Sequence, residues 1–136
     1  MERKKARELI ISHGTNSPLK IASERKIEIL YEDLGKHTWG YYTRIKRIPY
    51  IHINNRITYE CVLYTSAHEL GHDVLHPDVN VPFLRSNTLQ LADKLERQAH
   101  RFAVYLLIGD NQPVPGETKH QFLLRCGVPE MFHTFL

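Results

Sequence analysis

The sequence has few cysteines and no long apolar run, and both absences narrow the class of protein. Cys61 and Cys126 are the two cysteines among 136 residues, too few for a disulfide framework and not spaced like the CxxC pairs of redox and cysteine-type zinc sites. No stretch approaches the roughly 20 apolar residues of a membrane helix, and the charged start MERKKAREL differs from a signal peptide. We therefore expect a cytoplasmic protein with free thiols and no membrane contact.

A strong excess of one charge is also lacking. The 18 Lys and Arg residues are interspersed with 15 Asp and Glu residues, for a net charge of +3. Proteins that bind nucleic acid concentrate basic residues on one surface, so we expect no direct nucleic-acid contact and interpret the run Arg3-Lys4-Lys5 as a solvated helix face. The length and the 42% apolar content suit one domain over residues 1–136, without repeats or low-complexity linkers.

Two short helices are predicted near the start. Residues 2–13 carry apolar side chains at helical spacing, and Gly14 follows as a stop signal. Ser17 and Pro18 are an N-cap followed by proline at the first helical position, which predicts a second, shorter helix.

Two stretches alternate apolar and polar residues with the period of a half-buried strand. Residues 27–31 predict one strand, and residues 40–54 predict a hairpin. Pro49 cannot donate to a ladder, so we expect the second hairpin strand to have an open edge there. Trp39 is expected in the core and His52 on the hairpin surface.

Two long helices are predicted after the hairpin. The first covers residues 58–76 and ends before Pro77, with the buried stripe Leu63, Ala67, Leu70 and Val74. The second runs from about Asn87 to Leu107, with the stripe Leu91, Leu95, Ala99, Phe102 and Leu106. A short helix around residues 121–125 is expected in a C-terminal region, 113–136. Together these elements predict an α+β fold, in which a small antiparallel sheet with a hairpin packs on a helical core.

The motif AHELGH in the first long helix carries the chemistry. Residues four apart share one helix face, so His68 and His72 can each offer a ring nitrogen to one ion at about 2.0–2.1 Å. Glu69 lies about 100° around the axis, where it can reach a water on the ion without binding the ion itself. Zinc lowers the pKa of such a water to about 7, and the carboxylate can take its proton as it attacks a carbonyl. Gly71 leaves room for another element to approach.

A zinc site needs a third protein ligand, and several residues are candidates. His76 lies about 12 Å along the axis from His68, too far to share one ion unless the helix ends early. We favour Glu96, because packing the second long helix on the first would bury a carboxylate that needs a partner. Asp93 and His100 share its face and are rival ligands or residues that orient the site.

The paired motifs resemble the ImmA/IrrE family of zinc metallopeptidases. The resemblance rests on TSAHELGHDVLH at residues 65–76 and LERQAHRFAVYLL at residues 95–107, and YIHINN at residues 50–55 stands where the family has a strand before the active-site helix. It spans roughly residues 17–107 and is weak outside them.

This resemblance implies a small sheet on a helical core, with Zn²⁺ held by His68, His72 and Glu96 and with Glu69 as the catalytic base and acid. His100 stands where the family usually has Asn, which leaves open whether it contacts the metal. Other divalent ions also suit this ligand set.

The resemblance also implies a partner. Many members encoded by phages and mobile elements inactivate a helix-turn-helix transcriptional repressor by site-specific cleavage, so a zinc endopeptidase of this anti-repressor type is the leading hypothesis. The alternative is a zinc-containing regulatory protein that binds and antagonises the repressor without cutting it. A DNA-binding regulator is disfavoured by the modest charge.

The second hairpin strand is a candidate for holding an extended substrate. Peptidases commonly add the substrate to a sheet edge, and the strand in question comprises Tyr50, Ile51, His52, Ile53 and Asn54. Tyr64, one turn before the ligands, is either an oxyanion-stabilising group or a packing residue.

Overall fold

The computed structural model describes residues 1–78 and 89–136, although the side chains of 89–92 fall outside that description. The elements in chain order are α1 (Glu2–His13), α2 (Pro18–Glu24), β1 (Glu28–Glu32), β2 (Gly40–Ile45), β3 (Ile48–Asn54), α3 (Tyr59–Leu75), α5 (Leu89–Ile108), α6 (Lys119–Arg125) and the 3-10 helix η1 (Glu130–Phe135). The predicted α+β class is confirmed. None of the described helices is long and apolar enough to cross a bilayer.

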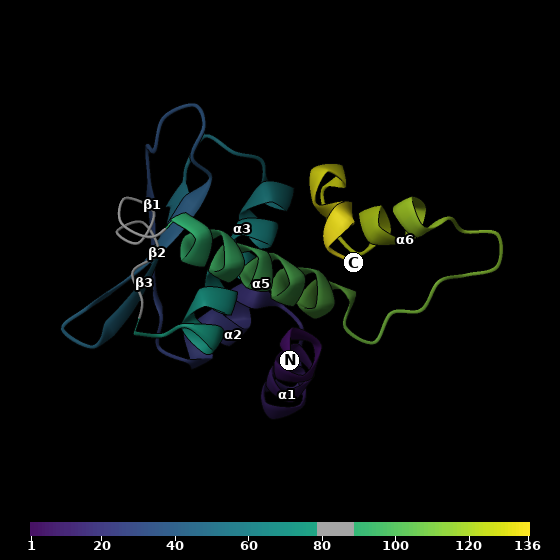
Figure 1. The fold of residues 1–136 in the computed structure, drawn as a ribbon, viewed down its shortest axis with the longest axis horizontal. Helices are drawn as coiled ribbons and strands as arrows, with labels where there is room; N and C mark the ends of the chain where they lie inside the picture. Colours follow the sequence, from purple (N-terminus) through teal and green to yellow (C-terminus); the bar gives the residue numbers. More distant parts are fainter. Residues whose placement is uncertain (79–88) are drawn as a thin grey trace.

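Helices α3 and α5 form the centre of the molecule. Figure 1 shows the sheet on one side of this pair, α1 and α2 below it, and α6 with η1 on the side away from the sheet. Helix α5 contacts α1, α3 and η1, whereas α3 also contacts β2 and β3. The pair therefore joins every layer of the fold.

The helix ends follow their capping residues. Gly14 ends α1 in the left-handed conformation with φ 67°, which glycine adopts easily because it has no β-carbon. The Ser17 hydroxyl accepts from the Lys20 amide at the start of α2, and the Thr58 hydroxyl accepts from the Cys61 amide at the start of α3. These starts, and the end of α3 at His76, confirm the predicted boundaries.

One predicted helix boundary differs from the observed one, and another lies outside the described residues. Helix α6 begins two residues before residue 121, because Thr118 and Gln121 form a reciprocal capping box. The predicted start at Asn87 lies outside the described residues, and so does the side chain of Leu91 in the predicted stripe.

The sheet is mixed rather than purely antiparallel. Its order is β1-β3-β2, with β1 parallel to β3 and β2 antiparallel to β3. The hairpin was predicted, but alternation alone does not state the direction in which β1 joins it. The prediction of an antiparallel sheet is therefore correct for the hairpin and wrong for β1.

Pro49 fits this sheet without an open strand. The Asn54 amide donates to the Trp39 carbonyl, so hydrogen-bonded pairs alternate from there and Arg44–Pro49 is a non-hydrogen-bonded pair. Pairing with β1 begins one residue later, at Tyr50. Neither neighbouring strand therefore requires a hydrogen bond from the nitrogen of Pro49. The residues after Pro49 belong to the central strand of the sheet.

The core lies between the inner face of the sheet and the helices. Its most completely buried large side chains include Ile21, Ile51, Ile53, Tyr64, Leu70, Phe102, Leu106 and Leu123. In α3 the stretch 64–73 is buried on every side, so the helix has no solvated face there, and Leu63 and Val74 at its ends are only partly buried. Polar groups in that stretch need partners inside the protein.

Two hairpin residues have mixed outcomes. His52 is 9% exposed, so the prediction of a surface position is wrong. Its ring stacks on Tyr41 and is hydrogen-bonded to Glu32 and Thr43. Trp39 packs against the core while remaining partly exposed.

Candidate metal centre

The two motif histidines lie on one face of α3. His68 and His72 are 6% and 2% exposed, and their ring centroids are 4.9 Å apart at nearly a right angle. Helical spacing of four residues brings the rings together, and the burial of α3 removes them from water.

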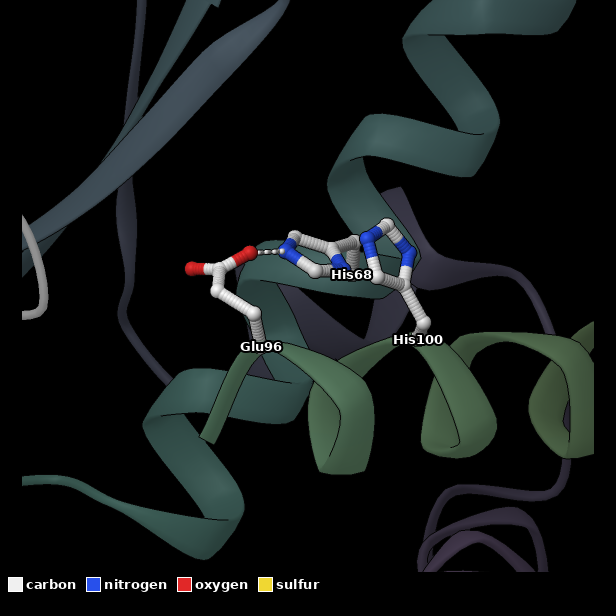
Figure 2. A group of neighbouring side chains, drawn as sticks. All are labelled: His68, Glu96 and His100. Carbon is white, nitrogen blue, oxygen red and sulfur yellow. Dashed lines mark hydrogen bonds and ion pairs between the residues drawn. The ribbon is translucent and has the colours of Figure 1, made fainter. Parts of the chain in front are cut away.

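Glu96 reaches both histidines from α5. Its Oε2 accepts from His68 Nε2 and its Oε1 accepts from His72 Nε2, each at 3.0 Å. Figure 2 shows the Glu96 carboxylate extending from α5 toward the ring of His68. The structure therefore brings together the three residues predicted to hold the ion.

Gly71 allows the close approach of α5 to α3. A β-carbon at this position would lie 3.0 Å from the Phe102 ring and 3.3 Å from the Ala99 backbone. A side chain here would require Phe102 or the α5 backbone, which also carries Glu96, to shift by a few tenths of an ångström. The close approach expected from the sequence is confirmed.

The Glu96 carboxylate is kept ionised. Burial alone would raise the pKa of Glu96, but hydrogen bonds and positive charge from His68 and His72 outweigh it and hold this pKa below its usual range. An ionised carboxylate beside two imidazoles is a ligand set that divalent zinc accepts.

The distance from each histidine to the Glu96 carboxylate is close to the distance between two zinc ligands. Ligands about 2.0–2.1 Å from zinc lie about 3.3 Å from one another, and each histidine is 3.0 Å from a different oxygen of the Glu96 carboxylate. Glu69 is 5% exposed, and its Oε2 lies 3.9 Å from His68 Nε2. The ligating atoms of His68, Glu69 and His72 lie within 4.8 Å of one another, so Glu69 stands beside the site.

His76 orients one of the two imidazoles. Its Nε2 donates to Gln98 Oε1 at 2.8 Å, and its Nδ1 lies 3.3 Å from His72 Nδ1. Burial lowers the pKa of His76 and favours its neutral form, so its Nδ1 is an acceptor and His72 Nδ1 donates. When an ion takes the place of the proton that His72 Nε2 shares with Glu96, the His72 Nε2 lone pair becomes available to that ion, because Nδ1 keeps its own proton.

His100 lies beside the cluster, and Asp93 does not. The ligating atoms of His68, Glu96 and His100 lie within 4.8 Å of one another, and the His100 ring is 4.1 Å from that of His68. Figure 2 shows one ring nitrogen of His100 facing His68. Asp93 is exposed and joins none of the candidate ligand groups found among the described residues.

Tyr64 holds His100 from behind. Its hydroxyl shares a 2.8 Å hydrogen bond with His100 Nδ1. Burial, and then the negative charges of Glu96 and Glu69, raise the pKa of Tyr64 above its usual value. The phenol therefore stays protonated at neutral pH and serves as a hydrogen-bond partner.

Asp73 is a site residue that the sequence analysis missed. It follows His72 directly, and its side chain is buried. Arg25 donates to its Oδ2 at 2.9 and 3.1 Å, and the Tyr42 hydroxyl donates to its Oδ1 at 2.7 Å. A charged residue next to a ligand on a fully buried helix is the signal that could have found it.

A cleft of about 740 Å³ opens onto the metal residues. It is lined by Leu34, His37, Thr38, Trp39, Gly40, Tyr41, Tyr42, Tyr64, Thr65, His68, Glu69, His72, Glu96, His100, Met131 and Phe132. Residues 131–132 come from η1, which the sequence analysis did not connect with the site.

The predicted substrate strand does not border this cleft. Residues 50–54 of β3 pair with β1 on one side and β2 on the other, so the prediction of an open edge for Tyr50, Ile51, His52, Ile53 and Asn54 is wrong. The strand that reaches the cleft is β2, through residues 40–42. At Gly40 a β-carbon would lie 2.6 Å from the Thr65 methyl group, so glycine permits β2 to pass close to α3.

The fold and the motif pair together define a known family. The IrrE N-terminal-like domain, a peptidase family, matches residues 22–113. The chain therefore belongs to the ImmA/IrrE family.

Two relatives show the same kinship. The chain is 35% identical over 133 residues to Metallopeptidase ImmA of Bacillus subtilis strain 168, which covers 92% of this chain and 77% of the relative. It is 38% identical over 102 residues to Uncharacterized immunity region protein 2 of Bacillus phage phi105, which covers 75% of this chain and 65% of the relative. The match thus spans less than two thirds of the phage protein's length. No solved structure matches the chain significantly.

Proposed function

We propose that this protein is a zinc-dependent endopeptidase that cleaves a protein substrate at a specific site. The observation that carries the proposal is the convergence of His68, His72 and Glu96, each histidine 3.0 Å from the carboxylate, with Glu69 at their side in a cleft. Two buried imidazoles and a carboxylate at such distances form a ligand set that a divalent cation can share.

The chain's residues divide the hydrolysis among them. His68, His72 and Glu96 would hold the ion, which supplies Lewis acidity when bound. Glu69 takes the proton from the attacking water and returns it to the leaving nitrogen. His76 determines which ring nitrogen of His72 carries the proton. His100, which is hydrogen-bonded to Tyr64, packs against the ring of His68.

The substrate would lie along the edge of β2. Because Trp39, Tyr41 and Thr43 pair with β3 through hydrogen bonds, Gly40 and Tyr42 direct their backbone amides and carbonyls away from it. Within the described ranges, no strand occupies that outer edge of β2. An extended peptide added there would cross the cleft beside Glu69.

The proposed substrate is a helix-turn-helix transcriptional repressor. Support comes from the relatives, one named a metallopeptidase and the other an immunity region protein of a phage. Cleavage of the repressor would release the genes it silences.

The test combines the purified protein with the repressor encoded by a neighbouring gene. Wild-type protein with zinc should produce two discrete fragments, and a chelator should prevent their appearance. Glu69→Gln should keep the bound zinc and lose cleavage by about 1,000-fold or more, since it removes the proton carrier. Glu60→Gln, on the exposed first turn of α3, is the matched control and should cleave normally.

Two results would count against the enzyme. If Glu69→Gln still produced fragments, the hydrolytic role of this residue would be wrong. If it relieved repression fully without fragments, the protein would be a binding antagonist of the repressor instead.

A further inference from the structure

The helix η1 lies far from the metal motif in sequence and outside the family match of residues 22–113, yet it borders the cleft. The Phe132 ring stacks on Tyr64 with centroids 4.2 Å apart and on His100 at 4.9 Å, and it meets Trp39 edge-on at 5.6 Å. One side chain of η1 therefore touches three residues that line the cleft.

The ring contacts continue to the metal residues. His100 lies between Phe132 and His68, with centroids 4.9 Å and 4.1 Å away respectively. Phe135 adds a second ring against His100 at 4.5 Å. The wall made by η1 is thus separated from the metal residues by the width of one imidazole.

This end of the cleft carries several large apolar side chains. Leu34 and Trp39 contribute from the segment before β2, together with the polar His37 and Thr38, and Met131 and Phe132 contribute from η1. Met131 is 65% exposed, which leaves a large apolar side chain at the mouth of the cleft for a ligand to cover. The carboxylates among the lining residues, Glu69 and Glu96, lie at the metal residues.

The position of η1 is fixed from behind. His133 is 2% exposed, and its Nε2 donates to the Val128 carbonyl at 2.8 Å. Its Nδ1 shares a 2.7 Å hydrogen bond with His120 Nδ1 of α6. A wall anchored by both nitrogens of a buried imidazole can select side chains by shape, because it does not yield readily to a poorly fitting one.

We infer that η1 and residues 34–39 form the specificity pocket of this peptidase, and that the pocket takes a large apolar side chain of the residue next to the scissile bond. The inference rests on the proposed function and deepens it. A peptide extended along β2 advances about 3.4 Å per residue, so the residue flanking the scissile bond is the one that reaches a wall one imidazole from His68. Leucine, methionine and phenylalanine have the size and chemistry to fill the space among Leu34, Trp39 and Phe132.

The experiment measures preference rather than activity alone. A mixture of unstructured peptides is digested with the zinc-loaded protein, and the new ends are identified by mass spectrometry. One position beside the cut should be enriched in large apolar residues. Matched peptides with Leu or Ala at that position then give the ratio of their kcat/KM values, which we expect to favour Leu by about 10-fold to 100-fold.

Phe132→Ala should reduce that Leu/Ala ratio by about 10-fold, because the wall loses its main ring. Met131→Ala, at the mouth of the cleft, should reduce it by about 3-fold and serves as the test if Phe132→Ala does not fold. Leu124→Ala is the matched control, since Leu124 is 54% exposed on α6 and away from the cleft, and its ratio should equal that of the wild type.

The outcomes separate this inference from the proposed function. Absence of any zinc-dependent cleavage of peptides and repressor by the wild type would overturn the peptidase itself. Cleavage without an apolar preference would overturn the pocket. Cleavage with a preference that neither Phe132→Ala nor Met131→Ala alters would overturn the role of η1.

Discussion

The two ends of the cleft are built by different means. At the metal end, α3 and α5 bring buried imidazoles and a carboxylate together through hydrogen bonds of 3.0 Å. At the other end, η1 contacts Tyr64, His100 and Trp39 through rings. Paired charges demand a fixed geometry, whereas apolar surfaces tolerate exchange of similar volume. The chemistry is therefore the constrained part of this protein, and the surface around it is the adjustable part.

The largest effect should come from removing the carboxylate that joins the two helices. Glu96→Ala takes away one of three proposed ligands, so the dissociation constant for zinc should rise by more than about 100-fold. This is a larger loss than the roughly 10-fold to 100-fold typical of residues that only orient a ligand. Competition with a chromophoric chelator measures it, and Glu60→Ala is the control. An unchanged zinc affinity would remove Glu96 from the ligand set.

The next effect concerns the spacing of α3 and α5. Gly71→Ala would place a methyl group 3.0 Å from Phe102 and 3.3 Å from Ala99, so overpacking should lower the free energy of unfolding by about 2 kcal/mol and weaken zinc binding as well. Urea denaturation checks the first and chelator competition the second. The control, Cys61→Ala, changes a partly exposed position of the same helix and should alter neither the stability nor the zinc affinity. If Gly71→Ala were as stable as Cys61→Ala, the two helices would not be tightly apposed.

A smaller effect is expected at the carboxylate beside His72. Tyr42→Phe removes the hydroxyl that donates to Asp73 at 2.7 Å, so stability should fall by about 1–2 kcal/mol through the loss of a buried hydrogen bond. Thermal and urea unfolding give the value. Tyr59→Phe, on the exposed first turn of α3, should have no effect; a Tyr42 variant as stable as this control would contradict the importance of the bond.

The smallest effect should appear at the surface of the region that carries η1. A hydrogen bond from Arg125, and another from the Val114 amide, lower the pKa of Glu117 to about 2. A lowered carboxyl pKa stabilises the fold above its unfolded value of about 4, and this contribution is lost as the pH falls toward 2. The Tm difference between wild type and Glu117→Gln should therefore be small at pH 7 and shrink between pH 4 and pH 2. A difference that grew on acidification would contradict this sign.

Most of the helical framework could be predicted because its signals are local. Gly14, Ser17, Thr58 and the residues around Pro77 mark helix ends through their own backbone preferences. Glu96 was predicted from the argument that a carboxylate on a packed helix face needs a partner, and the family resemblance implied the same residue. The structure places it accordingly, within 3.0 Å of both histidines.

The remainder depends on pairings between distant segments, which periodicity does not contain. The parallel alignment of β1 with β3 made the expected edge strand central. The burial of His52 comes from residues on both neighbouring strands. Phe132 contacts Tyr64 because η1 packs against the cleft. The sequence around Phe132 contains no motif that predicts a functional site.

The hydrogen bonds and ion pairs of Asp73 involve residues well outside the metal motif. Arg25, at the end of α2, is 2.9 Å from one oxygen of this buried carboxylate, and Arg44 of β2 is 3.9 Å from the other. A fragment trimmed to begin beyond residue 25 would keep every proposed ligand and yet lose the closer of the two arginines that face this buried carboxylate. We therefore expect the stability of the ligand helix to depend on an arginine 48 residues upstream of its partner.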